Sequence, residues 1–225
     1  MKDLKIDFVS DVACPWCAVG LASLERALEK LDGEVSAEIH FQPFELNPDM
    51  APGGQDAGEY LARKYGSTPQ QQKASRDAIR ARGAAVGFDF REEGRGRIYN
   101  TFNAHRLLHW AGLQDAGAQH ALKKALLKAY HGQGRSPEDE AVLLDAVAQA
   151  GLDTAKAREI LDSGEYAREV RESERMFQEA GIHAVPAVII NDRHLIQGGQ
   201  PPEMFEQALR QIATASMADQ APTAR

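Results

Sequence analysis

Apolar and polar side chains alternate over residues 4–10, which predicts a short β-strand at the start of the chain. After residues 14–17, leucines recur at helical spacing and charged residues occupy the opposite face, which predicts a helix that stops at Gly33. These leucines are Leu21, Leu24, Leu28 and Leu31. Residues 35–41 predict a second strand. The opening of the chain therefore predicts a strand, a helix and another strand.

Helical periodicity dominates from about residue 56 to residue 180. Thr68-Pro69-Gln70-Gln71 combines an N-cap, a proline at the first helical position and a capping-box glutamine, and Ser136-Pro137-Glu138-Asp139 follows the same pattern. A further helix is expected from Tyr166 to a stop at Gly181. Two further helices are indicated by apolar stripes. One stripe is Leu122, Leu126 and Ala129, and the other is Val142, Leu143, Ala146, Val147 and Ala150. We expect a helical domain of about five helices.

β-structure is predicted again near the end of the chain. Residues 185–190 form an apolar run typical of a buried strand, Asn191-Asp192 is a hairpin turn and residues 194–197 are its partner strand. A last helix has an apolar face made of Met204, Phe205, Ala208, Leu209 and Ile212. Residues 216–225 are small and polar, and we expect a flexible tail there. The fold class is therefore α/β, with two β-containing ends around a helical region.

Composition narrows the class of protein. The 225 residues, 43% of them hydrophobic and 26% charged, suit one large globular domain or one domain interrupted by another. The formal charge of -7 argues against a nucleic-acid partner. The apolar runs are shorter than the roughly 20 residues of a membrane span. Charges within residues 1–9 interrupt the apolar core of a secretory signal, so we expect a cytoplasmic protein.

The candidate chemistry is a pair of cysteines, Cys14-Pro15-Trp16-Cys17. At the start of a helix, Cys14 lies where free backbone N–H groups and the helix dipole favour a thiolate, and Cys17 lies one turn further in. Attack by Cys14 on a disulfide would give a mixed disulfide that Cys17 resolves. Pro15 fits the first helical turn, and Trp16 stacks beside the thiolate or covers the helix end.

Two other interpretations of the cysteine pair stay open: half of a metal site, or two inert buried thiols. The surrounding strand–helix–strand pattern favours redox chemistry. Pro186, at the start of a buried strand, suggests either a cis Val185–Pro186 bond that exposes the Val185 backbone near the dithiol, or an ordinary trans proline.

Other residues have weaker signals. His105 and His109 are four apart on an expected helix and could face one metal, although no glutamate follows His105 as in a zinc-protease motif, so we predict no metal site. Asp11 is expected to cap the turn before the helix. Gly94-Arg95-Gly96-Arg97 is interpreted as an exposed flexible loop.

Several segments together resemble a known family. They are Ser10-Asp11-Val12-Ala13-Cys14-Pro15-Trp16-Cys17, Pro43-Phe44-Glu45-Leu46-Asn47-Pro48, Asn100-Thr101-Phe102-Asn103-Ala104-His105-Arg106-Leu107, Val185-Pro186 and Gly198-Gly199-Gln200-Pro201. In this order they resemble the DsbA-like thioredoxin group, with the FrnE-type branch nearest, related to 2-hydroxychromene-2-carboxylate isomerases. The resemblance covers residues 4 to 212. It implies a thioredoxin fold with a large helical insertion.

The boundaries expected from this resemblance are residues 1–50 and 183–215 for the two parts of the thioredoxin-like domain, and 51–182 for the helical insertion. The resemblance also implies disulfide exchange, with Cys14 attacking, Cys17 resolving and a cis Pro186. Residues implied to line the substrate site are Pro15, Trp16, Val185, Asn103, His105 and Gln200. No bound cofactor is expected.

The resemblance also supplies an alternative function. Related isomerases and kappa-class glutathione transferases bind glutathione at this location, usually with serine where this chain has Cys14. Glutathione therefore remains a candidate thiol partner beside substrate disulfides or dithiols, and a glutathione-dependent isomerase or transferase is the alternative enzyme. A holdase that grips unfolded chains is a non-catalytic alternative. The direction of electron flow stays open, as does the choice between monomer and homodimer.

Overall fold

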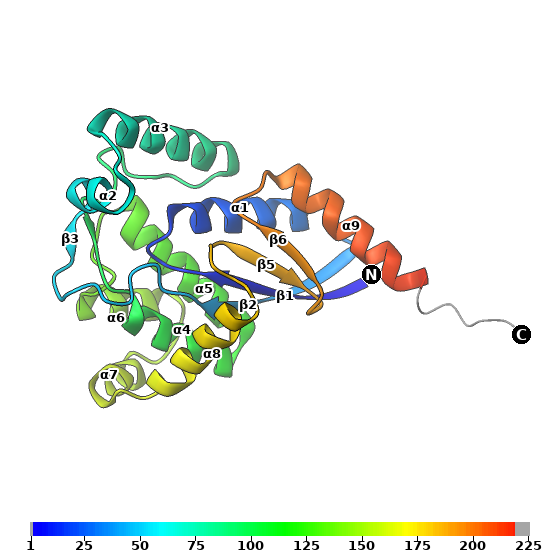
Figure 1. Ribbon diagram of the computed structural model, residues 1–225. Helices are drawn as coiled ribbons and strands as arrows, with labels where there is room; N and C mark the ends of the chain where they lie inside the picture. Colours follow the sequence, from blue (N-terminus) through cyan, green and yellow to red (C-terminus); the bar gives the residue numbers. More distant parts are fainter. Residues whose placement is uncertain (1, 219–225) are drawn as a thin grey trace, which may run out of the picture.

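The computed structural model of the protein describes residues 2–218, and its strand-rich ends are separated by a long helical stretch (Figure 1). The elements in chain order are β1 (Lys2–Ser10), α1 (Pro15–Lys30), β2 (Val35–Pro43), β3 (Gln55–Asp56), α2 (Ala57–Tyr65), α3 (Pro69–Val86), β4 (Arg97–Ile98), α4 (Phe102–Gln114), α5 (Ala116–Leu127), the π-helical turn η1 (Lys128–Gly132), α6 (Glu140–Gln149), α7 (Thr154–Ser163), α8 (Ala167–Glu179), β5 (Ala187–Ile190), β6 (His194–Gln197) and α9 (Pro202–Ala218). The predicted α/β class with a helical insertion is confirmed.

The central sheet has four strands in the order β2-β1-β5-β6. β1 and β2 run parallel, with Ile6 opposite Ile39, because the helix α1 carries the chain back across the sheet. β5 is antiparallel to both β1 and β6. The predicted turn between β5 and β6 is confirmed, since Asn191 and Asp192 adopt φ values of 52° and 55°, as a tight hairpin requires. The sheet thus joins residues from both ends of the chain.

The two faces of the sheet are covered by different helices. Phe8 of β1 lies in a buried cluster with residues of α1 and α9, including Leu24 and Phe205. Val9, one position further along the strand, packs instead with Phe177 of α8. This follows from the period of two in a β-strand, which turns neighbouring side chains to opposite faces. Burial of each such large apolar side chain stabilises the fold by about 1.5–3 kcal/mol.

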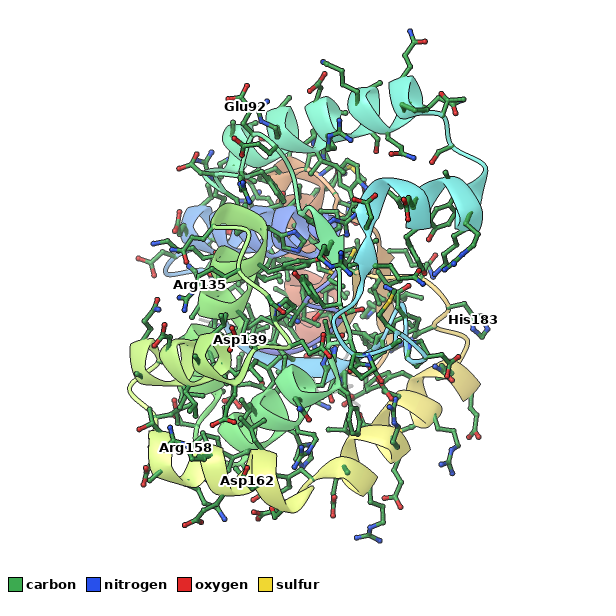
Figure 2. The ribbon with its side chains drawn as sticks, turned by 90° about the vertical axis from the view of Figure 1, so that its left-hand side faces the viewer. Glu92, Arg135, Asp139, Arg158, Asp162 and His183 are labelled. Carbon is green, nitrogen blue, oxygen red and sulfur yellow. The ribbon has the colours of Figure 1, made fainter. Side chains whose placement is uncertain are left out.

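The helical region has a buried core that also includes Val12 and Ala13 of the turn before α1, and Gln119 of α5 ties the region to the sheet. The Gln119 Oε1 accepts a hydrogen bond from the Phe41 N–H of β2 at 2.8 Å, and its Nε2 donates to the Phe41 carbonyl at 3.0 Å. The same Nε2 donates to the Leu108 carbonyl of α4, also at 3.0 Å. Charged side chains such as Arg158 and Asp162 point outward from this region (Figure 2). One buried amide therefore joins β2 to two helices.

Some predicted elements need correction. Within residues 2–218 the stretch between β2 and β5 contains seven α-helices, not five, together with the small β3–β4 sheet. The short helix α2 has no buried residue, and α7 has only Ala157 and Ile160 buried. Their sequences therefore carry little apolar pattern that could predict them. The capping box at Thr68 is confirmed. The segment at Ser136 is not a helix start, because Asp139 caps α6 by accepting from the Ala141 N–H.

Two boundaries and the burial of one residue near the end of the chain also differ from the prediction. β5 begins at Ala187, so Val185 and Pro186 precede the strand. Met204 is exposed, whereas Phe205 on the same helix is fully buried. The helix α9 continues to Ala218, beyond the expected start of the tail at 216, and residues 219–225 lie outside the described part of the chain. No helix in the described range 2–218 is both long and apolar enough to cross a membrane.

Candidate active site

Cys14 is the N-cap residue of α1, as the sequence predicts. Its backbone is extended, with φ -88° and ψ 114°, and Pro15 occupies the first turn of the helix, where a missing N–H costs no hydrogen bond. The Cys17 N–H donates to the Cys14 carbonyl at 3.1 Å, so one helical turn joins the two residues. Both cysteines are free thiols, with Cys14 4% exposed and Cys17 fully buried. Cys14 is thus the more accessible of the two.

A segment from the far end of the chain lies against this turn. The Cys14 thiol donates to the Val185 carbonyl with 3.6 Å between sulfur and oxygen. The Val185–Pro186 peptide bond is cis, in agreement with the expectation. A methyl group placed on Gly20 of α1 would lie 3.0 Å from the Pro186 Cγ and 3.3 Å from the Gly199 Cα. The helix and the Pro186 loop therefore approach so closely that a side chain at position 20 would crowd them.

The two thiols have opposite acidities. The hydrogen bond from Cys17 is the largest cause that lowers the pKa of Cys14, and the charge of Arg95 lowers it further, against the effects of burial and of Asp11. Burial is the largest cause that raises the pKa of Cys17 well above its usual value, followed by the hydrogen bond and charge of Cys14. This arrangement favours the thiolate on Cys14 rather than on Cys17. Such a pair can attack a disulfide through its outer sulfur.

Asp11 organises the loop before Cys14 and is fully buried. Its Oδ1 accepts from the Ala13 N–H at 2.9 Å and from the Thr101 hydroxyl at 2.8 Å, while its Oδ2 accepts from the Leu46 N–H at 2.7 Å. The His105 Nε2 lies 3.5 Å from Oδ1. Burial alone would raise the pKa of Asp11, but the hydrogen bond and charge of His105 and these backbone donors lower it overall. Asp11 therefore remains a carboxylate and fixes the loop, as a cap is expected to do.

Two further buried bases lie near the dithiol. Lys123 of α5 has no exposed surface, and burial lowers its pKa against the negative charges of Cys17, Asp11 and Cys14. His131 of η1 is 2% exposed, and its Nε2 donates to the Val12 carbonyl at 2.8 Å. Burial is the main cause that lowers the pKa of His131 to about 3, so this imidazole is neutral. The helical insertion thus supplies titratable groups to the cysteine site.

The loop at residues 94–97 is only partly exposed, and Arg95 ties it to the turn before Cys14. Its Nη1 donates to the Ala13 carbonyl at 2.7 Å, and the neighbouring Arg97 binds the Gly53 and Gly54 carbonyls at 2.9 Å each. A pocket of about 300 Å³ opens between this loop and α3, with Pro15 at its edge. The cationic residues of its wall are Arg76, Arg80, Arg91 and Arg95. Asp56 and Glu93 also line the pocket, so its wall beside Pro15 carries an excess of arginines over carboxylates.

The other residues expected at a substrate site lie in different surroundings. Trp16 is 36% exposed next to Cys17, and the Gln200 Nε2 donates to the carbonyl of Gln197 at the end of β6. His105 is only 2% exposed and stands behind Asp11. The Asn103 Oδ1 accepts from Arg106, whose guanidinium also binds the Ile160 carbonyl of the helical region. The structure therefore brings Pro15, Trp16 and Val185 to the dithiol but does not bring Asn103 into contact with it.

The histidine pair of α4 does not converge on one point. His105 faces Asp11, whereas the ring of His109 packs on Tyr166, with 5.3 Å between ring centroids. Among residues 2–218, no cluster of three or more histidine, cysteine or acidic side chains has the geometry to hold a metal ion.

The sequence interpretation missed Arg95, Lys123 and His131. Gly94-Arg95-Gly96-Arg97 has the local composition of an exposed loop, which hides the role of Arg95. Lys123 stands beside Lys124 on an amphipathic helix, where two lysines are typical of a solvated face. The one signal that could have found Lys123 is its position directly after Leu122 of the apolar stripe.

Comparison with known proteins relates most of the chain to one family. The family model described as a DSBA-like thioredoxin domain matches residues 5–210. The "probable DsbA oxidoreductase" of Streptomyces coelicolor has 33% sequence identity and a TM-score of 0.83, with 99% of this chain and 93% of that chain covered.

Two more distant structures share the fold alone. A 2-hydroxychromene-2-carboxylate isomerase has 18% identity and a TM-score of 0.67, with 97% of this chain and all (100%) of that chain covered. The cytosolic disulfide reductase DsbM of Pseudomonas aeruginosa, in a structure with GSH, has 18% identity and a TM-score of 0.60, with 95% of this chain and 99% of that chain covered.

Proposed function

The chain belongs to the DsbA-like thioredoxin domain family, and we propose that it is a protein disulfide oxidoreductase that works through Cys14 and Cys17. The observation that carries this proposal is the asymmetry of the pair. Cys14 caps α1 and has a lowered pKa, whereas Cys17 is fully buried and has a raised one. This is the division of labour that an attacking thiolate and a resolving thiol require.

The reaction proceeds in two displacements. The Cys14 thiolate attacks one sulfur of a substrate disulfide, the substrate S–S bond breaks, and one substrate thiolate leaves. Cys17 then loses its proton and attacks the Cys14 sulfur, which forms the Cys14–Cys17 disulfide and releases the second substrate thiolate. Two electrons pass to the substrate, and the same steps in reverse oxidise a dithiol. Substrates are the disulfides or dithiols of this exchange.

Val185 and Pro186 suit the binding of a substrate beside the sulfur. The Val185 carbonyl accepts a hydrogen bond from the Cys14 thiol, so it lies close to any group bonded to that sulfur. Trp16, which is 36% exposed on α1, offers an aromatic wall. In this proposal these residues, with Pro15, position the substrate, and Gln200 contributes from the rim of the following loop.

A redox titration in glutathione buffers, followed by thiol trapping, tests the proposed function. A single two-electron transition of the purified protein that links Cys14 to Cys17 is expected, and its midpoint gives the direction of electron flow. Cys14→Ser should abolish turnover, and Cys17→Ser should accumulate mixed disulfides. Full activity of the Cys14→Ser protein would contradict the proposal.

Glutathione is the thiol partner that we propose for this site. The arginine-lined pocket beside Pro15 supports it, because glutathione carries two carboxylates and arginine binds carboxylates through paired hydrogen bonds. Turnover with glutathione disulfide should have a several-fold higher KM in an Arg80→Gln protein. Turnover with the uncharged hydroxyethyl disulfide should not change. An equal effect on both substrates would rule out charge recognition in this pocket.

The alternative enzyme, a glutathione-dependent isomerase or transferase, is favoured only by the shared fold with 2-hydroxychromene-2-carboxylate isomerase. It predicts activity that survives Cys17→Ser, since no resolving thiol is needed. We propose the cytoplasm as the site of action, a compartment that the distant fold relative DsbM also occupies.

A further inference from the structure

Lys123 of α5 is a buried amine without a hydrogen-bonded partner in the described part of the chain. None of its surface is exposed, and its Nζ makes no hydrogen bond within residues 2–218. The Nζ lies 5.8 Å from the centroid of the Phe41 ring. The next residue, Lys124, is more than half exposed and pairs with Glu25 at 2.8 Å. Since a buried cation without a hydrogen-bonded counter-charge is costly, the position of Lys123 suits a place that an anion can reach.

A pocket between β2, α4 and α5 runs from the surface of the molecule toward Lys123. Gly112 and Leu113, near the end of α4, line this pocket and are exposed. Phe41, Leu108 and Lys123 also line it, and they are buried. Because the Phe41 ring lies both on the pocket wall and beside the Lys123 Nζ, the amine is located at the inner end of the pocket.

The size of the pocket limits what it can hold. Its volume is about 170 Å³. This volume holds several water molecules at about 30 Å³ each, and it is below the roughly 300–1,000 Å³ of pockets for drug-sized ligands. A ligand of this pocket is therefore an ion or a molecule of a few heavy atoms.

The polar side chains of the pocket wall favour a negative charge. They are His40, Gln42, His105, His109, Gln119 and Lys123, and no carboxylate of residues 2–218 is among the lining groups. The Glu38 carboxylate pairs with His40 at 2.9 Å but does not line the pocket, and the same holds for Asp11, 3.5 Å from His105. The Gln119 amide is occupied by backbone groups of β2 and α4. Lys123 and the histidines are therefore the groups left to bind a ligand.

We propose that this pocket binds a small oxyanion, such as inorganic phosphate or a short carboxylate, with Lys123 at its inner end. The oxyanion supplies the hydrogen-bonded counter-charge of the Lys123 ammonium, and its other oxygens accept hydrogen bonds from N–H groups of the lining histidines. Hydrogen bonds between charged partners are about twice as strong as those between neutral groups. The site shares no residue with the arginine-lined pocket beside Pro15, so it does not depend on the proposed disulfide exchange.

Isothermal titration calorimetry of the full-length protein tests this site. Sodium phosphate and sodium acetate are titrated separately at pH 7, and sodium chloride keeps the ionic strength constant, so that chloride serves as the anion without oxygens. At least one oxyanion should bind at one site per chain, and the one that binds tells a tetrahedral ligand from a planar carboxylate. Lys123→Met should weaken this binding about tenfold, because the ligand loses a charged donor. Lys124→Met, a matched loss of charge on the same helix, should bind as the wild type does.

Three results would overturn the proposal. Neither oxyanion binds saturably to the wild type, or the wild type and Lys123→Met bind the oxyanion equally well. In the third, binding is lost in Arg80→Gln and kept in Lys123→Met, which would locate the anion in the arginine-lined pocket.

Amide chemical shifts of the wild-type protein provide a second measurement, which needs no variant to fold. On titration with phosphate or acetate, the changes should centre on Phe41, Gly112 and Gln119, which line the pocket from its three elements. Changes confined to residues 91–96, on the wall of the arginine-lined pocket, would contradict the proposed site.

Discussion

Arg95 donates a hydrogen bond to the carbonyl oxygen of Ala13, the residue that precedes the nucleophilic cysteine in the proposed reaction, with 2.7 Å between nitrogen and oxygen. The contact joins the loop before β4, more than 80 residues further along the chain, to the start of α1. It brings a permanent cation close to Cys14, and this cation lowers the pKa of the thiol. The helical insertion thus contributes directly to the chemistry of the CxxC turn.

Replacement of Arg95 by Gln should raise the pKa of Cys14, because the thiolate loses a favourable charge. The alkylation of Cys14 by iodoacetamide at pH 7, measured in a Cys17→Ser background, should slow several-fold, and the midpoint of its pH profile should move upward. Arg97→Gln is the control, since Arg97 binds the Gly53 and Gly54 carbonyls on the same loop. Equal pH profiles for the Arg95 and Arg97 variants would contradict this role.

His131 should make the protein sensitive to acid. Burial lowers its pKa to about 3, whereas an unfolded histidine titrates near 6.5. Between these values the unfolded chain binds a proton that the folded protein cannot, so the free energy of unfolding falls as the pH drops from about 6.5 towards 3. In the middle of this range, the free energy of unfolding falls by about 1.4 kcal/mol for each pH unit.

Urea denaturation of His131→Gln at pH 7 and pH 4.5 checks this prediction. The wild type should lose about 2 kcal/mol more than the variant between the two pH values. His183→Gln is the control, because His183 projects from the loop between α8 and β5 (Figure 2). The same pH dependence in wild type and His131→Gln would show that another group controls acid sensitivity.

Gly20→Ala should destabilise the protein although alanine is the better helix former. The added methyl group would lie 3.0 Å from the Pro186 Cγ, so α1 and the Pro186 loop must move apart. Overpacking of this kind costs about 1–3 kcal/mol. Thermal unfolding measures the loss, and the thiol-exchange rate of Cys14 should fall as well because Val185 moves with Pro186. A variant as stable as the wild type would show that the Pro186 loop can move away from α1 without a loss of stability.

Arg171 of α8 should be needed to stabilise two buried carboxylates. Its Nη1 pairs with Glu45, which follows β2, and with Glu174 at 2.9 Å, and its guanidinium lies 3.9 Å from the centroid of the Phe102 ring. Arg171→Met should cost about 1–3 kcal/mol at pH 7, since Arg171 itself is partly exposed.

The cost of Arg171→Met should be smaller at pH 5. Burial raises the pKa of Glu45, so that one of the two carboxyls takes up a proton more readily once the arginine is gone. Arg168→Met removes an exposed charge from the same helix and should change the free energy of unfolding by less than about 0.5 kcal/mol. Chemical denaturation at both pH values distinguishes the cases, and a loss for Arg171→Met that does not depend on pH would argue against an electrostatic origin.

The sequence predicts those parts of the fold that depend on local patterns. The helix start at Cys14, the capping box at Thr68 and the hairpin at Asn191-Asp192 follow from the preferences of single residues and their neighbours, and the structure confirms all three. The parallel pairing of β1 and β2 follows from the helix between them.

Residues whose surroundings come from distant segments could not be predicted in this way. Arg95 donates to the Ala13 carbonyl and Lys123 is fully buried, although the local pattern around each is that of a surface. His105, which the family resemblance implies for the substrate site, is 2% exposed and lies 3.5 Å from the carboxylate of Asp11, which is distant in sequence. Burial of a polar residue is decided by tertiary partners, which periodicity does not reveal.

The amide of Gln119 has a consequence for the behaviour of the protein at high concentration. β2 is an edge strand of the central sheet, and edge strands with free backbone groups can recruit a strand from another molecule. By binding both the N–H and the carbonyl of Phe41, the Gln119 side chain takes the place that a foreign strand would occupy. The helical insertion therefore also protects the β2 edge of the sheet from pairing with a strand of another molecule. The other edge strand, β6, is then the one at which such pairing would begin.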